Sequence, residues 1–302
     1  MTLSLNIEKG RQIAPLLYKA FATTGIHGRV DMPEDEPPAG VTAGSLEHIL
    51  FLTQTVAIDY QRDAPALWQS ARMTYEDPST RYLFEPAEVY ETPFSIVMKD
   101  MQKYGLSKKQ RNDAFIWSTV ALSFLKKWDG DPRNFLADCS WDGPTILQRL
   151  KNDRHPYGDK FALDFPFLRG DKIGPLWIRM LRDNAGIDQF RNLEKIPIPV
   201  DIHIARATLA TGIVRGEYSG SFNNLFEQIR QAWFESVRGI MVNGKALIAL
   251  DVDEPLWHLS KFGCRRRDAT TGKCPLKESC EFSEFCIPGT IRILKNSAEM
   301  KT

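Results

Sequence analysis

An aspartate at the start of an expected helix is the first residue in this chain placed to do chemistry. The segment 196–200 reads Ile-Pro-Ile-Pro-Val and is followed by Asp201 and by the small and apolar residues of 202–212. Prolines hold a backbone extended and disfavour helix just before themselves, so the helix is expected to begin at Asp201. Asp is a good N-cap, and the helix dipole at that end favours an ionised carboxylate. Asp201 is therefore either a simple cap or a rigidly aimed catalytic carboxylate.

Four cysteines crowded near the end of the chain form the second chemical signal. Cys264, Cys274, Cys280 and Cys286 have the spacing Cys-x9-Cys-x5-Cys-x5-Cys. Without a secretory signal, a disulfide set is disfavoured. Four thiolates hold either structural zinc, which favours short Cys-x2-Cys pairs that are absent here, or a 4Fe-4S cluster, which tolerates longer loops. The basic run 265–267 would favour ionised thiolates or face phosphates.

The elements that position these residues are mostly helices. Apolar residues recur at helical spacing, and strict alternation is scarce, so we expect a mainly α protein. The expected helices are 3–23, a start at 45–48, 64–73, 94–103, one opening at 107–111, 144–151, 175–182, 221–237 and 255–262. Residues 25–44 and 158–174 are expected to be loops, and 241–252 fits either a strand or a helix.

Composition places the chain in the class of ordinary globular proteins. It has 302 residues, 43% of them hydrophobic and 25% charged, and a net charge of +1. This charge neither requires nor excludes a nucleic-acid partner, which would need a local basic face. We find no membrane-spanning run and no signal peptide, and expect a cytoplasmic protein without a membrane partner.

Taken in order, these signals resemble the helix-hairpin-helix DNA glycosylases of the endonuclease III type. The segment 200–206 is similar to the family's catalytic turn, and the cysteine loop follows it in the same order. Residues 50–57 resemble the family's early helix, and 104–109 through 130–132 resemble its next helix and turn. The apolar segment 255–259 resembles the helix before the family's cysteines.

The resemblance implies a fold, an activity and partners. The fold would be mainly α and two-lobed, with a C-terminal iron-sulfur loop at 264–286. Residues 45–180 would form a helical barrel domain with the hairpin near 168–175, and 1–44 plus 181–302 the second lobe. The activity would be that of a DNA glycosylase, which flips a modified base out of double-stranded DNA and cleaves its N-glycosidic bond. We expect a monomer.

The resemblance assigns Asp201 the catalytic role and leaves Lys172 as an alternative. The family hairpin is usually Leu-Pro-Gly-x-Gly, whereas 168–174 reads Leu-Arg-Gly-Asp-Lys-Ile-Gly. Counting from Gly170, the position of the lyase lysine holds Gly174, which implies a monofunctional glycosylase. The register of archaeal 8-oxoguanine glycosylases instead places Lys172 at the nucleophile position, where a neutral amine would form a Schiff base. We expect Asp201 to act alone, and AP-lyase activity stays open.

Further residues are assigned to DNA, to the base or to the metal. Gln54 would fill the gap left by the flipped base, and Tyr60, Trp68 and Trp177 could stack on it or belong to the core. Gly170 and Gly174 would bind phosphate through backbone N–H groups. His203, expected to be mainly structural, and Arg206 complete the set. Three of the four late cysteines match family ligands, the second family ligand falls at Thr271, and Cys286 is its expected replacement, ahead of Cys139.

Three other interpretations stay open. The unusual hairpin and the insertion 153–165 suggest a pocket for a bulky base, such as hydroxymethylcytosine or its glucosylated form in phage DNA, which would make this a defence enzyme. A salvage N-glycosidase acting on a modified nucleoside or nucleotide is a second interpretation. A non-catalytic DNA-binding or redox-sensing iron-sulfur protein is the third.

Overall fold

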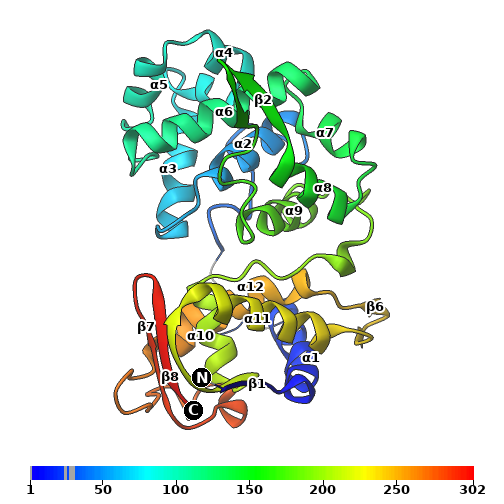
Figure 1. The fold of residues 1–302 in the computed structure, drawn as a ribbon, viewed down its shortest axis with the longest axis vertical. Coiled ribbons are helices and arrows are strands. Elements are labelled where there is room, and N and C mark those ends of the chain that lie inside the picture. The colour runs from blue at the N-terminus through cyan, green and yellow to red at the C-terminus, as the bar shows by residue number, and fades with distance from the viewer. Residues whose placement is uncertain (1, 24–25, 27–30) are drawn as a thin grey trace. The chain divides into compact units, whose positions relative to one another are not determined.

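The computed structural model describes residues 2–23, 26 and 31–302, and these divide into two compact units. Unit 1 combines residues 1–30 with 196–302, and unit 2 is the continuous segment 31–195. The two units are coloured by residue number in Figure 1. Part of the expected loop 25–44, namely 25 and 27–30, lies outside the described residues, and the rest of it contains no helix or strand.

Unit 2 is helical, as expected. Its elements are α2 (Leu46–Ala57), α3 (Ala64–Glu76), η1 (Arg81–Phe84), α4 (Pro86–Glu91), α5 (Phe94–Asp100), α6 (Gln110–Trp128), α7 (Pro132–Asp138), α8 (Gly143–Asn152), β2 (Arg154–Tyr157), β3 (Lys160–Leu163), α9 (Ile173–Asp183) and η2 (Leu193–Lys195). Helix α2 is buried along most of its length and packs on α6 and α9. A helix that is apolar on nearly all sides is stable only in such a central position.

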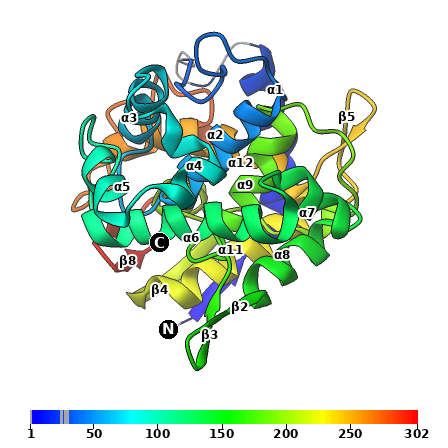
Figure 2. The ribbon, with the colours of Figure 1, turned by 90° about the horizontal axis from the view of Figure 1, so that it is seen from above.

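The insertion 153–165 contains two strands, and the second of them occupies the start of the expected loop 158–174. Strands β2 and β3 pair antiparallel, with Arg154 opposite Leu163 and Tyr157 opposite Lys160. Gly158 provides a positive φ of 58° at the turn between them, a conformation that glycine adopts at little cost. The insertion is therefore a β-hairpin, and Figure 2 shows its tip extending beyond α6 and α8.

Unit 1 combines helices with a four-stranded sheet. Its elements are β1 (Thr2–Leu5), α1 (Ile7–Thr23), α10 (Ile202–Ala210), β4 (Val214–Ser221), α11 (Phe222–Val237), β5 (Met241–Val242), β6 (Lys245–Ala246), η3 (Ala249–Val252), α12 (Asp253–His258), the π-helical turn η4 (Leu259–Gly263), η5 (Cys264–Arg266), η6 (Ser283–Phe285), β7 (Thr290–Ile293) and β8 (Ser297–Lys301). Helix α1 packs on α11, and α10 on α12.

The four-stranded sheet of unit 1 corrects the expectation of a helix from residue 3. The strand order is β1-β4-β8-β7, and all neighbours are antiparallel. Leu3 pairs with Gly216 rather than continuing α1 toward the N-terminus, because β4 offers it a hydrogen-bonding edge. The chain is mainly helical, with this sheet and two small hairpins added.

The unit boundaries differ from the expected ones at 44/45 and 180/181. The loop before α2 belongs to unit 2 because Arg72 donates to the carbonyls of Pro33 (2.9 Å) and Glu36 (2.8 Å). Asn184 donates to the carbonyl of Glu34 at 3.0 Å. These bonds tie the loop to α3 and to the end of α9.

Candidate functional site

Asp201 is the N-cap of α10, as the proline pattern predicted. Its Oδ1 atom accepts hydrogen bonds from the backbone N–H groups of His203 (2.7 Å) and Ile204 (2.9 Å). The backbone at Asp201 is extended, with φ −125° and ψ −171°. The two bonds fix the carboxylate against the positive end of the helix dipole. Among the described residues, the other oxygen of this carboxylate accepts no hydrogen bond.

His203 and Arg206 lie beside Asp201 on the first turns of α10. The Nη1 atom of Arg206 is 3.5 Å from Nδ1 of His203 and 3.3 Å from the hydroxyl oxygen of Ser260. The ring of Trp257 lies against the imidazole, with the ring centres 5.4 Å apart. The structure therefore brings Asp201, His203 and Arg206 into one polar cluster in unit 1.

Asp201 and Arg206 have opposite effects on the pKa of His203. Burial lowers the pKa of His203 to about 4, and Arg206 lowers it further while Asp201 raises it. The imidazole is consequently neutral at pH 7. Burial also lowers the pKa of Arg206, and the charges of Asp201 and Cys264 raise it. The charge of Arg206 therefore interacts with both Asp201 and the first cysteine of the late group.

The cysteine loop is closed onto the end of α10. The backbone N–H of Ile287 donates to the carbonyl of Ala210 at 3.0 Å. The Nη2 atom of Arg267 donates to the carbonyls of Ile287 (2.7 Å) and Gly289 (2.8 Å), which ties the two ends of the loop together. Gly212 has a φ of 72°, and a Cβ there would meet Ile287 at 2.7 Å. Close packing thus fixes the loop relative to the helix that carries Asp201.

The four late cysteines form no disulfide and lie close enough to influence one another. Burial raises the pKa of Cys264, and the charges of Cys286, Cys280 and Cys274 raise it further. In the described part of the chain, no three His, Cys, Asp or Glu side chains converge tightly enough to hold one metal ion. Cys139 lies in unit 2, where burial raises its thiol pKa to about 11.

Lys172 lies in unit 2 and contacts a carboxylate that the sequence did not single out. Its Nζ atom is 3.1 Å from Oδ2 of Asp59 and 3.3 Å from the Asp59 carbonyl oxygen. Asp59 is buried and follows the end of α2. An ammonium group that binds a carboxylate is not a nucleophile, because its lone pair carries a proton.

Gly170 and Gly174 use their own N–H groups inside the turn. Gly170 N–H donates to the carbonyl of Phe167 at 2.8 Å, and Gly174 N–H to the carbonyl of Gly170 at 2.9 Å. A Cβ at Gly174 would meet the Leu147 side chain at 2.9 Å. Gly174 therefore allows α8 and α9 to approach closely. Both N–H groups donate within the turn, and phosphate binding by these glycines stays a prediction.

The residues expected to contact the flipped base lie mostly in the interior of unit 2. Gln54 is buried and its Nε2 is 3.5 Å from the Trp117 carbonyl, so it does not reach the surface. Trp177 is fully buried, and its indole N–H donates to the Thr53 hydroxyl at 2.9 Å. Trp68 is buried as well. All three are therefore packing residues in this structure, and their contact with a flipped base or with the gap it leaves stays a prediction.

Tyr60 is the aromatic residue of this set that is not buried. Its hydroxyl donates to Oδ1 of Asp113 at 2.5 Å, and its ring stacks on Phe167 with the centres 4.2 Å apart. Lys109 Nζ lies 4.3 Å from the ring centre. Phe167 adopts a φ of 62°, which is strained for a bulky side chain.

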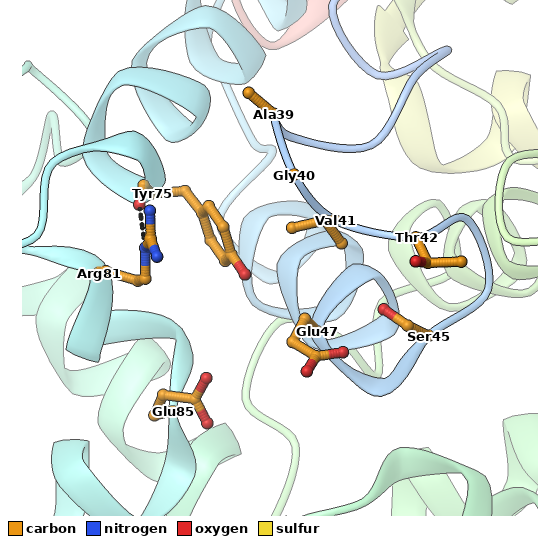
Figure 3. Close-up of a pocket in the computed structure, with 9 residues that line it drawn as sticks. All are labelled: Ala39, Gly40, Val41, Thr42, Ser45, Glu47, Tyr75, Arg81 and Glu85. Atoms are coloured by element: carbon orange, nitrogen blue, oxygen red, sulfur yellow. Dashed lines mark hydrogen bonds between the residues drawn. The ribbon is translucent and has the colours of Figure 1, made fainter.

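A cavity of about 600 Å³ in unit 2 contains none of the predicted site residues. Figure 3 shows Tyr75 and Arg81 on one side of it, with Glu47 and Glu85 nearby. The charges of Glu88 and Glu47 help burial to raise the pKa of Glu85. Two carboxylates against one guanidinium disfavour a phosphate, so this cavity is not a good DNA site.

Two residues of these clusters, Asp59 and Ser260, were missed by the sequence analysis. Asp59 meets a lysine 113 positions away in the chain, and Ser260 meets a histidine 57 positions away. No local pattern marks either residue, because both partnerships depend on tertiary structure. The π-helical turn that carries Ser260 also has no sequence signature that we recognised.

Comparison with known proteins gives the fold. No family model matches the chain, and no curated protein matches it. Among solved structures, the chain is similar to one described as the structure of a thermostable thymine-DNA glycosylase. The TM-score is 0.50 and the identity 15%, and the match covers 92% of this chain and 99% of that one. The two proteins share a fold. In the described residues, no helix is long and apolar enough to cross a bilayer.

Proposed function

We propose that this protein is a monofunctional DNA glycosylase in which Asp201 promotes hydrolysis of the N-glycosidic bond of a flipped base. The observation that carries the proposal is the fixed carboxylate: Asp201 caps α10 with one oxygen and keeps the other out of any hydrogen bond with described residues. The shared fold with a thymine-DNA glycosylase adds support, since in that fold the same kind of reaction is carried out by that protein.

The proposed reaction separates charge at the sugar. The C1′–N bond breaks, its electron pair leaves with the base, and the base takes up a proton. The sugar becomes a cation that resembles an oxocarbenium ion, and a fixed carboxylate stabilises it by electrostatic attraction. Water then adds to C1′ and gives up a proton, which leaves an abasic site. Asp201 can accept this proton through its second oxygen.

The surroundings of Asp201 suit this role. His203 is neutral at pH 7, so it neither neutralises the carboxylate nor competes with the sugar cation for it. Arg206 occupies the next turn of α10 and is attracted by Asp201. Its positive charge is available to a phosphate that approaches the helix. Asp201 therefore remains the group that supplies negative charge to C1′.

We propose that the cysteine loop holds a 4Fe-4S cluster, because its spacing lacks the short Cys-x2-Cys pairs that structural zinc sites favour. The charges of the other three thiols all raise the pKa of Cys264, so the four groups lie near one another. Zinc is the alternative occupant of the same four residues. When bound, the cluster would cross-link the loop that closes onto α10. The residues that would hold it are Cys264, Cys274, Cys280 and Cys286.

The proposal extends to the base that the enzyme removes. We propose a modified base in double-stranded DNA, with bulky forms such as hydroxymethylcytosine and its glucosylated derivative as members of the test panel. The insertion 153–165 forms a protruding hairpin, so it does not enlarge a pocket within unit 2. The panel therefore includes small lesions and bulky bases on equal terms.

The test is a base-release assay on purified protein. Duplexes carrying deaminated, oxidised, alkylated and bulky bases, together with phage genomic DNA, are incubated with the protein, and released base and abasic sites are measured. We expect release from at least one duplex and none from the matching free nucleoside. Turnover of nucleosides alone would identify a salvage enzyme. Duplex binding without release from any substrate would identify a DNA-binding protein.

A further inference from the structure

The tip of the β2–β3 hairpin exposes two aromatic side chains. Tyr157 is 71% exposed and Phe161 is 75% exposed. They are the most exposed large hydrophobic side chains in the part of the chain that the structure describes. Exposed aromatic surface is unfavourable in water, and clusters of it commonly mark a surface that binds another molecule.

The base of the hairpin is held firmly on α6. Buried Asp164, just after β3, accepts from His155 Nδ1 at 2.9 Å and forms an ion pair with Lys127. Lys127 Nζ also donates to the carbonyl of Arg154 at 2.8 Å. Ser123 donates to the carbonyl of Asp164 at 2.9 Å. The base of the hairpin is therefore fixed to α6 of unit 2.

The strand register places the two rings on opposite faces of the tip. Tyr157 lies opposite Lys160, and Phe161 lies opposite Pro156. Directly paired residues point to the same face, and neighbouring pairs point to opposite faces. The tip can consequently contact one flat surface on each side. Stacked bases are flat surfaces of this kind, and stacking on them is tolerant of sequence because every base has a π face.

The charge of the hairpin matches a nucleic acid. Its strands and turn carry the cations of Arg154 and Lys160 against the single carboxylate of Asp159. The acidic residues that flank the two strands are both paired, Asp153 with Arg149 and buried Asp164 with Lys127. Lys160 at the tip can pair with a phosphate while the aromatic rings meet bases.

The hairpin also begins beside the glycine turn of unit 2. Strand β2 follows the end of α8, and Lys151 in the last turn of α8 binds Asp171 of that turn, with Nζ 2.6 Å from Oδ1. Figure 1 shows β2 and α8 as neighbours. The turn that resembles the family's DNA-binding hairpin and the aromatic tip therefore belong to one connected region.

We propose that the β2–β3 hairpin is a DNA-binding wedge that stacks Tyr157 and Phe161 on bases of duplex DNA where the helix is opened. This inference rests on the proposed function, which requires an opened duplex, and it adds the surface that holds the opening. A wedge of this kind stabilises the distorted duplex by replacing lost base stacking with aromatic stacking.

The test compares the double variant Tyr157→Ser/Phe161→Ser with wild type. The control is Phe115→Ser, which removes an exposed aromatic ring (51% exposed) from α6 of the same unit. The probe is a duplex that carries 2-aminopurine beside a tetrahydrofuran abasic-site analogue. Binding is followed by anisotropy, and base unstacking by the fluorescence of 2-aminopurine.

We expect the double variant to bind at least ~10-fold more weakly and to lose most of the fluorescence rise, with an unchanged melting temperature. The control should stay within about twofold of wild type on the same stacking argument. Equal binding and fluorescence for the double variant would overturn the inference. So would a loss of self-association, seen by sedimentation, with DNA binding unchanged.

The wedge and the glycosylase proposals fail in different ways. Base release by wild type together with a normal double variant would leave the proposed function standing and remove the wedge. Tip-dependent fluorescence without base release from any duplex would retain the wedge and remove the proposed function. If wild type binds no duplex at low salt, both are wrong.

Discussion

Arg206 donates a hydrogen bond to Nδ1 of His203, with the two nitrogen atoms 3.5 Å apart. Since a guanidinium can only donate, the imidazole accepts through Nδ1 and carries its proton on Nε2. The bond therefore selects one neutral tautomer beside Asp201. One helix, α10, thus presents a carboxylate, a neutral ring and a cation within two turns.

This arrangement predicts an acid-sensitive unit 1. The pKa of His203 is about 4 when folded and about 6.5 when unfolded, so the folded state binds fewer protons between these values. Its contribution to stability is present above pH 6.5 and is lost as the pH falls toward 4. The loss is at most about 3 kcal/mol, reduced by solvent screening of the partly exposed ring. His203→Gln should remove this part of the pH dependence in thermal unfolding followed from pH 7 to pH 4.

His48 gives the matched control in the other unit. Burial also lowers its pKa to about 4, and its Nδ1 accepts from the backbone N–H of Gly44 at 3.2 Å. His48→Gln should change the acid response of unit 2 and leave that of unit 1 as it is. An acid response of unit 1 that is the same in wild type and His203→Gln would contradict the assignment.

Two substitutions distinguish the proposed catalytic role of the Asp201 charge from its role as the N-cap of α10. Asn is also a good N-cap, so Asp201→Asn should keep stability while base release falls about 10²–10⁴-fold. Asp201→Ala loses both roles and should in addition destabilise the protein by about 1 kcal/mol. Single-turnover base release and thermal unfolding measure the two effects. Unchanged base release in Asp201→Asn would show that the residue is only a cap.

The N-cap position of Asp201 could be predicted from sequence because the residues that determine it are adjacent in the chain. Prolines in 196–200 and an N-cap residue occupy adjacent positions, and their effects need no tertiary contact. The ion pair of Lys172 with Asp59 spans 113 positions and has no such signal. For Gln54 and Trp177, residue type and structural environment point in different directions. Their residue types suit base contacts, but helix packing buries both.

The sheet of unit 1 was missed because β4 does not show alternation. Its inward positions hold Val214 and Tyr218, while Gly216 and Gly220 interrupt the pattern of polar and apolar side chains. The β5–β6 hairpin, in contrast, carried a readable signal. Asn243-Gly244 is a strong hairpin turn, and both residues have positive φ, 50° and 78°. That pair would have resolved the ambiguity at 241–252.

Lys172 should not form a covalent intermediate with DNA. Its amine binds buried Asp59 in the free protein, and that carboxylate favours the ammonium over the neutral amine. Lys172→Ala removes one partner of a buried carboxylate, so it should lower the stability of unit 2 while base release per folded protein stays within about threefold of wild type. Borohydride trapping on a cleaved substrate should give no adduct in wild type. An adduct that disappears in Lys172→Ala would instead establish a bifunctional enzyme.

The late cysteines and Cys139 should behave differently. Cys280→Ser removes one of four mutually interacting thiols and should abolish visible absorbance and bound iron while lowering the melting temperature of unit 1. Cys139→Ser should change none of these, because Cys139 lies in unit 2. Absorbance and metal analysis of both purified variants decide the matter. Bound zinc without iron in wild type would replace the cluster by a zinc site.

Glu34 predicts a stabilising substitution in unit 2. Burial, helped by the charges of Asp35 and Asp59, raises its pKa to about 8, and no atom of the described residues bonds its buried Oε2. The unfolded carboxyl ionises near pH 4.5, so the stability of unit 2 is full below that value and falls as the pH rises through 8.

Glu34→Gln has no such charge to bury. At pH 8.5 the substitution should therefore increase the free energy of unfolding by an amount on the order of 3 kcal/mol and raise the melting temperature. At pH 4 both quantities should be nearly unchanged. Glu36→Gln on the same loop is the control, because the Glu36 side chain is exposed to solvent. An equal gain at both pH values would mean that the introduced amide improves packing and that the buried charge is not the cause.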